Sequence, residues 1–207
     1  MRLFRPGLPV RLIYKRAIFR LPEEGKVLYL SFDDGPNSGS SENILSILEK
    51  HGIKAMFFCT GKLAENNSVL MNRIRAGGHV VGNHGYLHLD GFKTSLKDYT
   101  DNIRKAAKLT SSGIFRPPYG RITPFQYNAI KKDYQIVFWD LMPYDFDDSF
   151  PASRSLEILK RKIRPGSVIV LHDRPECSVH RYLDEFILYS LSKGYRFEIP
   201  GQLNKYS

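Results

Sequence analysis

The chain has 207 residues, of which 42% are hydrophobic and 25% are charged, and its net charge is +10. This length fits one domain with a buried core, and the composition is typical of a globular protein. The chain contains two cysteines, Cys59 and Cys177, whose spacing excludes a disulfide framework or a metal knuckle, so we expect both to be buried thiols.

The positive charge is concentrated at the start of the chain. Residues 1–20 contain no acidic residue, and their longest apolar run is too short for a signal peptide or a membrane span. Peripheral contact with an anionic membrane is one role for such a segment; the alternative is a strand or helix that packs on the domain with its arginines in water. We expect no nucleic-acid partner, because no basic recognition helix or stacking motif accompanies the charge. The basic residues are Arg2, Arg5, Arg11, Lys15, Arg16 and Arg20.

From residue 26 onward, short apolar runs alternate with amphipathic patterns, without a repeat, a linker or a domain break. We therefore divide the chain into a basic N-terminal extension, 1–25, and one domain, 26–207. The expected strands are 27–32, 55–59, 79–82, 114–116, 135–139, 167–171 and 195–199. The expected helices are 42–51, 67–76, 95–110, 124–132, 153–163 and 180–193.

Strands that alternate with helices indicate parallel β-α units, whose strands are covered on both faces and read as continuous apolar runs. Seven such units predict an α/β fold, a single-domain distorted (β/α)7-type barrel of mainly parallel strands with outer helices. In a barrel of this kind the functional groups collect at the carboxyl ends of the strands.

Polar clusters follow nearly every expected strand. Because these strand ends meet at one edge of the barrel, we expect the clusters to form one site. They are Asp33 and Asp34 after the first strand, His84 and His88 after the third, Arg116 to Gly120 at the fourth, Asp140 to Asp145 after the fifth, and His172 and Asp173 after the sixth.

The spacing of His84 and His88, four residues apart, is typical of metal ligands. Two imidazoles need a third ligand, and a carboxylate is the usual complement. One of Asp33 and Asp34 can supply it, which leaves the other as a base towards water at the metal. A bound cation would also offset the repulsion between the two adjacent carboxylates.

Five ordered motifs carry a resemblance to a known family. They are Ser31-Phe32-Asp33-Asp34-Gly35-Pro36, the His84 and His88 pair, Arg116-Pro117-Pro118-Tyr119-Gly120, the acid and aromatic after Trp139, and Val170-Leu171-His172. Together they resemble the motifs of the polysaccharide deacetylases, the NodB-homology domain of carbohydrate esterase family 4. The resemblance runs from about residue 26 to residue 200.

The resemblance implies a metal site and a base. Asp34, His84 and His88 would bind a divalent metal, usually Zn²⁺, with Co²⁺, Ni²⁺ or Mn²⁺ as alternatives. Asp33 would be the general base, and Arg116 would pair with it and keep it ionised.

The same resemblance implies the other side of the reaction. His172 would protonate the departing amine, and Asp145 would orient His172 and raise its pKa. The backbone N–H of Tyr119 would help to hold the oxyanion. Trp139 and Leu171 would line the slot for the acetyl methyl group.

Three positions depart from the family pattern. Gly85 stands where the family often has Ser or Thr, and we expect the metal loop to lose a hydroxyl and to be looser. In the fourth motif, Met142 replaces an acid and Phe146 replaces the usual aromatic residue, which predicts an altered substrate wall.

The function that the resemblance implies is removal of N-linked acetyl groups from an N-acetylated amino sugar in a glycan or lipid-linked glycan. Two alternatives stay open: a metal-dependent deformylase or amidase that acts on a non-polymeric amide, and a non-catalytic glycan-binding relic of the fold. The absence of a signal peptide or span predicts a cytoplasmic protein, with a peripheral position on the inner membrane face as a variant of that prediction.

Overall fold

The strands form one sheet in which every pair is parallel. A computed structural model describes residues 3–21, 25–201 and 203. The sheet has the order β5-β4-β3-β2-β1-β6, with β7 paired to β1. The predicted parallel α/β barrel is therefore confirmed. The strands are β1 (Val27–Asp33), β2 (Met56–Cys59), β3 (Val80–Asn83), β4 (Ile114–Phe115), β5 (Gln135–Ile136), β6 (Ser167–His172) and β7 (Arg196–Phe197).

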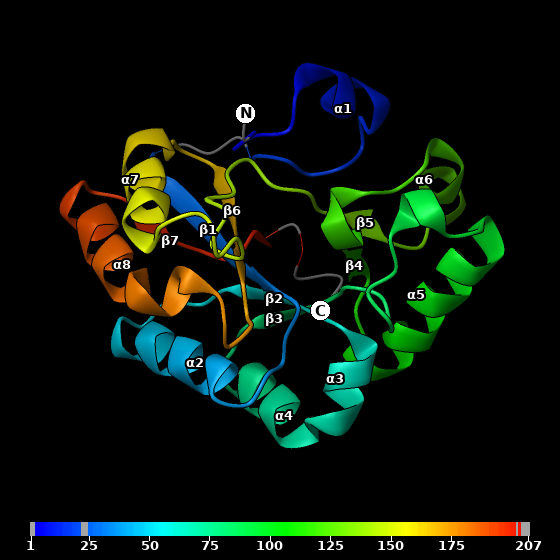
Figure 1. Cartoon of the computed structure of the whole chain (residues 1–207), viewed down its shortest axis with the longest axis horizontal. Helices are drawn as coiled ribbons and strands as arrows, with labels where there is room; N and C mark the ends of the chain where they lie inside the picture. The colour runs from blue at the N-terminus through cyan, green and yellow to red at the C-terminus, as the bar shows by residue number, and fades with distance from the viewer. Residues whose placement is uncertain (1–2, 22–24, 202, 204–207) are drawn as a thin grey trace.

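Helices α2 to α8 surround the strands, and α1 lies apart from that ring (Figure 1). Their starts follow local chemistry: the Ser95 hydroxyl accepts a hydrogen bond from Asp98 N at α5, and Thr123 and Gln126 form a capping box at α6. The helices are α1 (Leu8–Ile13), α2 (Ser40–Lys50), α3 (Gly61–Asn66), α4 (Ser68–Ala76), α5 (Leu96–Thr110), α6 (Pro124–Ile130), α7 (Ala152–Lys162) and α8 (Leu183–Ser192).

Alternation along the strands separates two layers of core. Leu28, Leu30 and Ile169 belong to the large apolar cluster between the sheet and the helices. Tyr29 and Val168 belong to a second cluster with residues of β2, β3 and β4, in the interior of the barrel. Successive strand residues point to opposite faces, so both faces of β1 and β6 are apolar.

The register brings the functional strand ends together. Asp33, the last residue of β1, is paired with Phe58 of β2 and with His172 of β6. Cys59 of β2 is paired with Asn83, the last residue of β3. The segments that follow β1, β3 and β6 therefore leave the sheet at the same end.

Residues 18–21 of the N-terminal segment lie between the two outer strands of the sheet. Ile18 pairs with Val137, next to β5, while Arg20 pairs with Ser167 of β6. Further along β6, Leu141 pairs with Ile169 and brings the chain after β5 against β6. The N-terminal segment therefore supplies part of the seam that closes the barrel, and the predicted boundary at residue 26 does not separate it from the domain's sheet.

Two α-helices were not predicted, and four strands are shorter than predicted, two of them by three residues. Helices α1 and α3 have six residues each, too few to show a helical period in the sequence. The predicted strand 135–139 is reduced to Gln135–Ile136; Val137 N still donates to Phe115 O of β4, and Ile18 bonds to Ile136 O and to Phe138 N on the other side. The predicted strand 195–199 is reduced to Arg196–Phe197, the part that pairs with β1.

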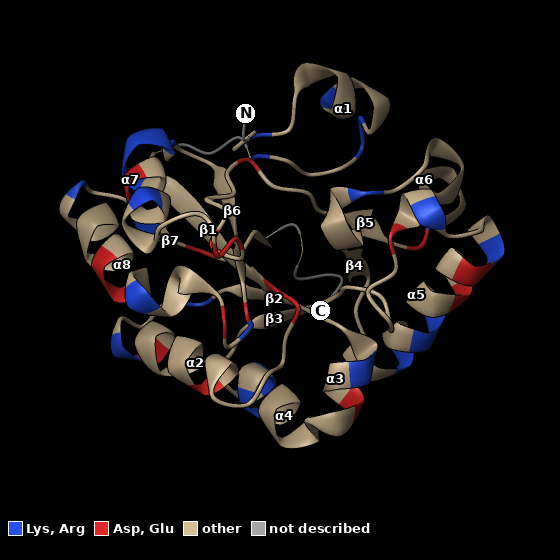
Figure 2. Ribbon diagram, viewed as in Figure 1, with Lys and Arg blue, Asp and Glu red and all other residues tan. Residues whose placement is uncertain are grey.

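Charge is distributed differently inside and outside the ring of helices. Figure 2 shows acidic segments within the ring, around the carboxyl end of β1, and basic segments mainly on the outer helices. Both cysteines are buried and free, as expected. Among the described residues, no helix combines the length and apolar character needed to cross a membrane.

The packing of Phe19 predicts that the N-terminal segment contributes to stability. Phe19 is 6% exposed and stacks on Phe138 with ring centroids 4.8 Å apart. We expect Phe19→Ala to lower the free energy of unfolding by about 3–5 kcal/mol, because it leaves a cavity in the seam. Phe125→Ala, at a position that is 79% exposed, is the matched control and should change it by less than about 0.5 kcal/mol. Equal urea unfolding curves for the two variants would show that the segment is not part of the folded unit.

Candidate active site

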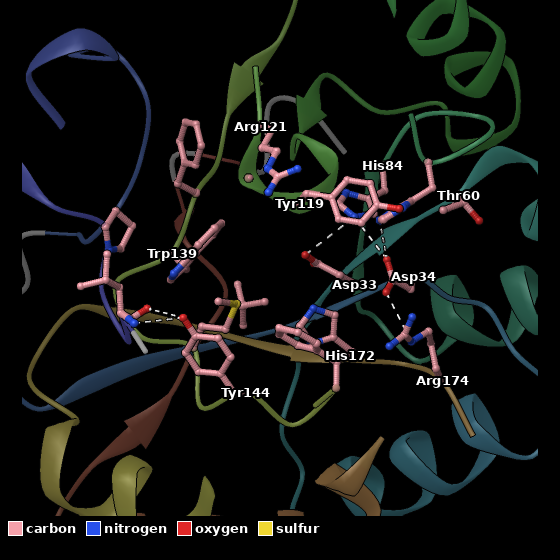
Figure 3. A pocket seen from close by; sticks show the side chains of 18 of the residues that line it. Asp33, Asp34, Thr60, His84, Tyr119, Arg121, Trp139, Tyr144, His172 and Arg174 are labelled. Carbon is pink, nitrogen blue, oxygen red and sulfur yellow. Dashed lines mark hydrogen bonds and ion pairs between the residues drawn. The ribbon is translucent and has the colours of Figure 1, made fainter. Parts of the chain in front are cut away.

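A cleft of about 860 Å³ opens at the carboxyl ends of the strands. Figure 3 shows side chains from several separate segments pointing into it. This convergence is the one expected for a parallel barrel. The predicted site residues that line the cleft are Asp33, Asp34, His84, His88, Tyr119, Trp139 and His172.

The backbone at Asp34 explains how two adjacent carboxylates reach one site. Strand β1 ends at Asp33, and Asp34 has a φ of 74°, in the left-handed region. Neighbouring residues of a regular strand would point to opposite faces. The turn at Asp34 breaks this alternation, so both carboxylates line the cleft.

Asp34, His84 and His88 form a cluster suited to a metal ion. Asp34 Oδ1 lies 3.4 Å from His84 Nε2 and 3.0 Å from His88 Nε2, and one ligand atom from each residue lies within 4.8 Å of the others. Asp34 Oδ1 is buried, yet neither contact has the direction of a hydrogen bond. A buried acceptor beside two imidazole nitrogens fits a divalent cation at their centre.

The protonation states also fit a metal ligand set. His84 Nδ1 lies 2.8 Å from the carbonyl oxygen of Arg116 and donates a hydrogen bond to it, so Nε2 is the ring nitrogen that faces Asp34 and would ligate a metal. Burial favours a higher pKa for Asp34, but the two imidazoles outweigh burial and hold its pKa well below the usual value. The Asp34 carboxylate is therefore ionised.

Arg116 holds Asp33 on the opposite side from the imidazoles. The Arg116 side chain is fully buried, and its Nη1 donates to Asp33 Oδ1 at 2.6 Å. Asp33 Oδ2 lies 3.9 Å from His84 Nε2. One carboxylate oxygen is thus restrained by the guanidinium, while the other faces the cluster of candidate metal ligands.

His172 and Asp145 form a second paired acid and base. His172 Nδ1 lies 2.9 Å from Asp145 Oδ1, and the backbone N–H of His172 donates to Asp145 Oδ2 at 2.7 Å. Burial would lower the pKa of His172, but the charge of Asp145 and its hydrogen bond reverse the effect, and the pKa rises to about 9. The imidazole is therefore protonated at neutral pH, with Nε2 left for a group in the cleft.

Tyr119 and Trp139 lie beside this cluster, whereas Leu171 does not. The Tyr119 ring packs edge-on against His88 with centroids 4.5 Å apart, and its residue has a φ of 58°. Leu171 is fully buried in the cluster between the sheet and the helices. Val170, one residue earlier, lines the cleft instead, because it shares a face of β6 with His172. The apolar wall from this strand is therefore Val170.

The loop around Gly85 is held without the hydroxyl that the family pattern supplies. Gly85 has a φ of 75°, and a Cβ there would lie 2.6 Å from Asn102 Nδ2. Gly85 N donates to Asn83 Oδ1 at 2.8 Å, and Leu87 N donates to Asn102 Oδ1 at 2.8 Å. Two asparagine side chains thus hold the loop between His84 and His88, contrary to the expected loosening.

The other two departures line the cleft near His172. The Phe146 ring packs edge-on against the His172 imidazole with centroids 4.7 Å apart. Met142 lines the cleft and donates its backbone N–H to Phe4 O at 3.0 Å. The altered wall is therefore built partly from the N-terminal segment.

Asp173, predicted together with His172 after the sixth strand, supports the site, and Arg174, which the sequence did not single out, lines it. Asp173 is fully buried and accepts hydrogen bonds of 2.5 Å from the hydroxyls of Ser40 and Ser41, and burial raises its pKa to about 6. A Cβ at Gly35 would clash with it, so it fixes the turn after Asp34. Arg174 lines the cleft with its Nε 3.6 Å from Asp34 Oδ2. The position of Arg174 two residues after His172 was the signal available for it in the sequence.

Comparison with known proteins gives consistent similarities. The family model described as polysaccharide deacetylase matches residues 20–136. A peptidoglycan-N-acetylglucosamine deacetylase of Bacillus cereus is 34% identical over 179 residues, which cover 81% of this chain and 64% of the relative. A chitooligosaccharide deacetylase of Bradyrhizobium is 30% identical over 154 residues, 70% of each chain.

One solved structure is similar to this chain over nearly the full length of both. The crystal structure of the Bc1960 peptidoglycan N-acetylglucosamine deacetylase, in complex with an aromatic N-hydroxybenzamide, has a TM-score of 0.87 and 29% identity. The match covers 97% of this chain and 99% of that structure. The chain spans somewhat less than two thirds of the 34% identical Bacillus cereus relative.

The cluster predicts a measurable metal affinity. We expect metal-free protein to bind Zn²⁺ or Co²⁺ at one site. Loss of a residue that only supports a metal ligand weakens metal binding by about 10–100-fold, so His84→Ala, which removes a ligand itself, should weaken it by more than this. His180→Ala, which removes an imidazole outside this cluster, is the matched control and should leave the affinity unchanged. Calorimetric titration measures both. If the two variants bind with equal affinity, the cluster is not the metal site.

Proposed function

We propose that this chain, which belongs to the polysaccharide deacetylase family, is a metal-dependent hydrolase that removes N-linked acetyl groups from an N-acetylated amino sugar in a glycan or lipid-linked glycan. One observation carries the proposal. A cluster of three candidate metal ligands shares its cleft with two separate paired groups, Asp33 with Arg116 and His172 with Asp145.

The relatives support the class of substrate. By their names, they deacetylate peptidoglycan N-acetylglucosamine or chitooligosaccharides. Both are glycans that carry an acetylated amine on a sugar ring. An amide of this kind must enter the cleft with its carbonyl carbon near Asp34 and its nitrogen near His172.

The donor set suits a divalent metal, and Asp34, His84 and His88 would hold it. When bound, the metal supplies Lewis-acid chemistry: it polarises a carbonyl oxygen and lowers the pKa of water. We assign proton abstraction from the attacking water to Asp33. Because Arg116 restrains Asp33 Oδ1, Oδ2 is the atom that takes the proton.

The second pair completes the proton balance of the reaction. Cleavage of the C–N bond leaves an amine, which must gain a proton to depart. We assign this proton to Nε2 of His172, whose Nδ1 is held by Asp145. The raised pKa of His172 keeps the acid form available at neutral pH.

The remaining walls suit an acetyl group and an oxyanion. The residue Tyr119 sits beside His88 in a left-handed conformation, and we assign its backbone N–H to the developing oxyanion. Trp139 and Val170 offer an apolar surface for the methyl group. A non-catalytic relic of the fold is disfavoured, because the base and the acid are each present with a partner.

Acetate release tests the function directly. We expect the zinc- or cobalt-loaded protein to release acetate from peptidoglycan fragments, N-acetylchitooligosaccharides or lipid-linked precursors. Asp33→Asn should lower kcat by about 10²–10⁴-fold, because the base is lost while the metal ligands stay. Formate release from N-formyl analogues, measured in parallel, separates a deacetylase from a deformylase. The absence of release from every substrate by metal-loaded protein would contradict the proposal.

The acid predicts the alkaline side of the pH profile. His172 must be protonated, so kcat should fall as the pH rises through about 9. Asp145→Asn removes the charge that raises this pKa, while burial still lowers it. The fall should therefore begin at lower pH in Asp145→Asn than in the unaltered protein, with both profiles measured on the same metal. If kcat falls over the same alkaline pH range in both proteins, His172 is not the acid.

A further inference from the structure

Residues 3–10, here called the arm, form one side of the cleft. Five residues of the arm line it: Leu3, Arg5, Pro6, Gly7 and Val10. In Figure 3 the arm lies across the cleft from Asp34 and Arg174, with Trp139 and Tyr144 between them. The motifs of the deacetylase domain do not include this wall, since they begin at Ser31.

The first attachment of the arm is to the loop after Trp139. The Tyr144 hydroxyl accepts a hydrogen bond from Leu3 N and donates one to Leu3 O, both at 3.0 Å. Phe4 packs edge-on against the Tyr144 ring with centroids 5.5 Å apart, and Phe4 O accepts from Met142 N. Tyr144 itself has a φ of 63°, so this loop is folded sharply where it meets the arm.

The second attachment is ionic and buried. The Asp140 side chain is fully buried, with Arg5 Nε at 3.4 Å and Arg11 Nη2 at 3.1 Å from its oxygens. Arg164, from the other side, also pairs with this carboxylate. A buried carboxylate requires such partners, so Asp140 holds the arm on the barrel through Arg5 within it and Arg11 directly after it.

We propose that the arm is a binding wall for the sugar units that flank the reacting sugar, and that it makes the enzyme sensitive to the length of the glycan. This inference rests on the proposed function. Leu3 is 64% exposed although it lines the cleft, and with Trp139 and Tyr144 it offers an apolar and aromatic surface. Such surfaces suit the C–H faces of sugar rings.

The position of the arm explains the altered fourth motif. Met142 and Phe146 stand where the family pattern has an acid and a different aromatic residue, and Met142 bonds to the arm through its backbone. The loop thus contacts substrate on one side and the arm on the other. The arm replaces part of the wall that the departures remove.

Tyr144→Phe tests the attachment with little change of shape. It removes both hydrogen bonds to Leu3 and keeps the ring. We expect kcat/KM to fall about tenfold on an N-acetylchitohexaose and less than about twofold on an N-acetylchitobiose, the tenfold change corresponding to about 1.4 kcal/mol. Tyr189→Phe, whose hydroxyl contacts Lys160 O away from the cleft, is the matched control.

Deletion of residues 1–4 tests whether Tyr144 acts through the arm. The deletion should reproduce the length-dependent loss, and Tyr144→Phe should add nothing in the deleted protein. An equal loss on both glycans, together with a shifted pH profile, would show that the arm only supports the loop of Asp145. An undiminished effect of Tyr144→Phe in the deleted protein would show that its hydroxyl contacts substrate directly; either result overturns the proposal.

Binding provides a readout that does not depend on turnover. Trp139 is the single tryptophan of the chain and lies in the cleft, so its fluorescence reports titration with the same two glycans. If the hexaose binds in a way that depends on the arm but no acetate is released, the proposed function is refuted and the proposal that the arm binds sugar stands. If acetate is released but the fluorescence titrations of the unaltered and deleted proteins are equal, the proposal that the arm binds sugar is refuted and the proposed function stands.

Discussion

The pair of Arg116 and Asp33 is the interaction on which the cleft depends. Arg116 is fully buried and donates to Asp33 Oδ1, Ser31 Oγ, Val137 O and Phe138 O at 2.6–3.1 Å, while its guanidinium lies 3.9 Å from the centroid of the Phe58 ring. A buried cation with these partners joins β1, β2 and the chain after β5 across the barrel interior. Separation of a buried ion pair leaves an uncompensated buried charge, so Arg116 and Asp33 constrain each other's position. It also sets the backbone of Arg116, whose carbonyl orients His84.

Backbone strain is gathered at the same place. Of the five non-glycine residues with positive φ among those the structure describes, four line the cleft: Asp34, His88, Tyr119 and Tyr144. Conformations of this kind cost of order 1–3 kcal/mol each and persist where the surroundings determine them. The rigid barrel supplies those surroundings, since Asp34 follows a strand that is buried along its whole length. The four turns aim side chains that regular strands and helices would point elsewhere.

The sequence predicted the strand ends well because its signals there are local and chemical. Apolar runs that end in Asp33, His84, Arg116 or His172 indicated where each strand stops and which functional group lies at its end. The Leu171 assignment was wrong by one residue, since the alternation of β6 places Val170 beside His172. The seam could not be predicted, because Ile18 and Arg20 join the sheet through single bridges that leave no periodic pattern. Nor does a short basic segment indicate that its charges have a buried partner.

The buried carboxylate of Asp140 gives the N-terminal positive charge a structural role. In the sequence, six basic residues without an acid indicated a surface facing water or an anionic membrane. In the fold, two of them neutralise Asp140, which is fully buried and whose pKa is about 2, because Arg164, Ser167 and Arg5 outweigh the effect of burial. Salt screens a buried pair much less than an exposed one, so the attachment persists at ionic strengths that would release the segment from a charged surface. Part of the excess positive charge is therefore structural: it closes the barrel and carries the arm to the edge of the cleft.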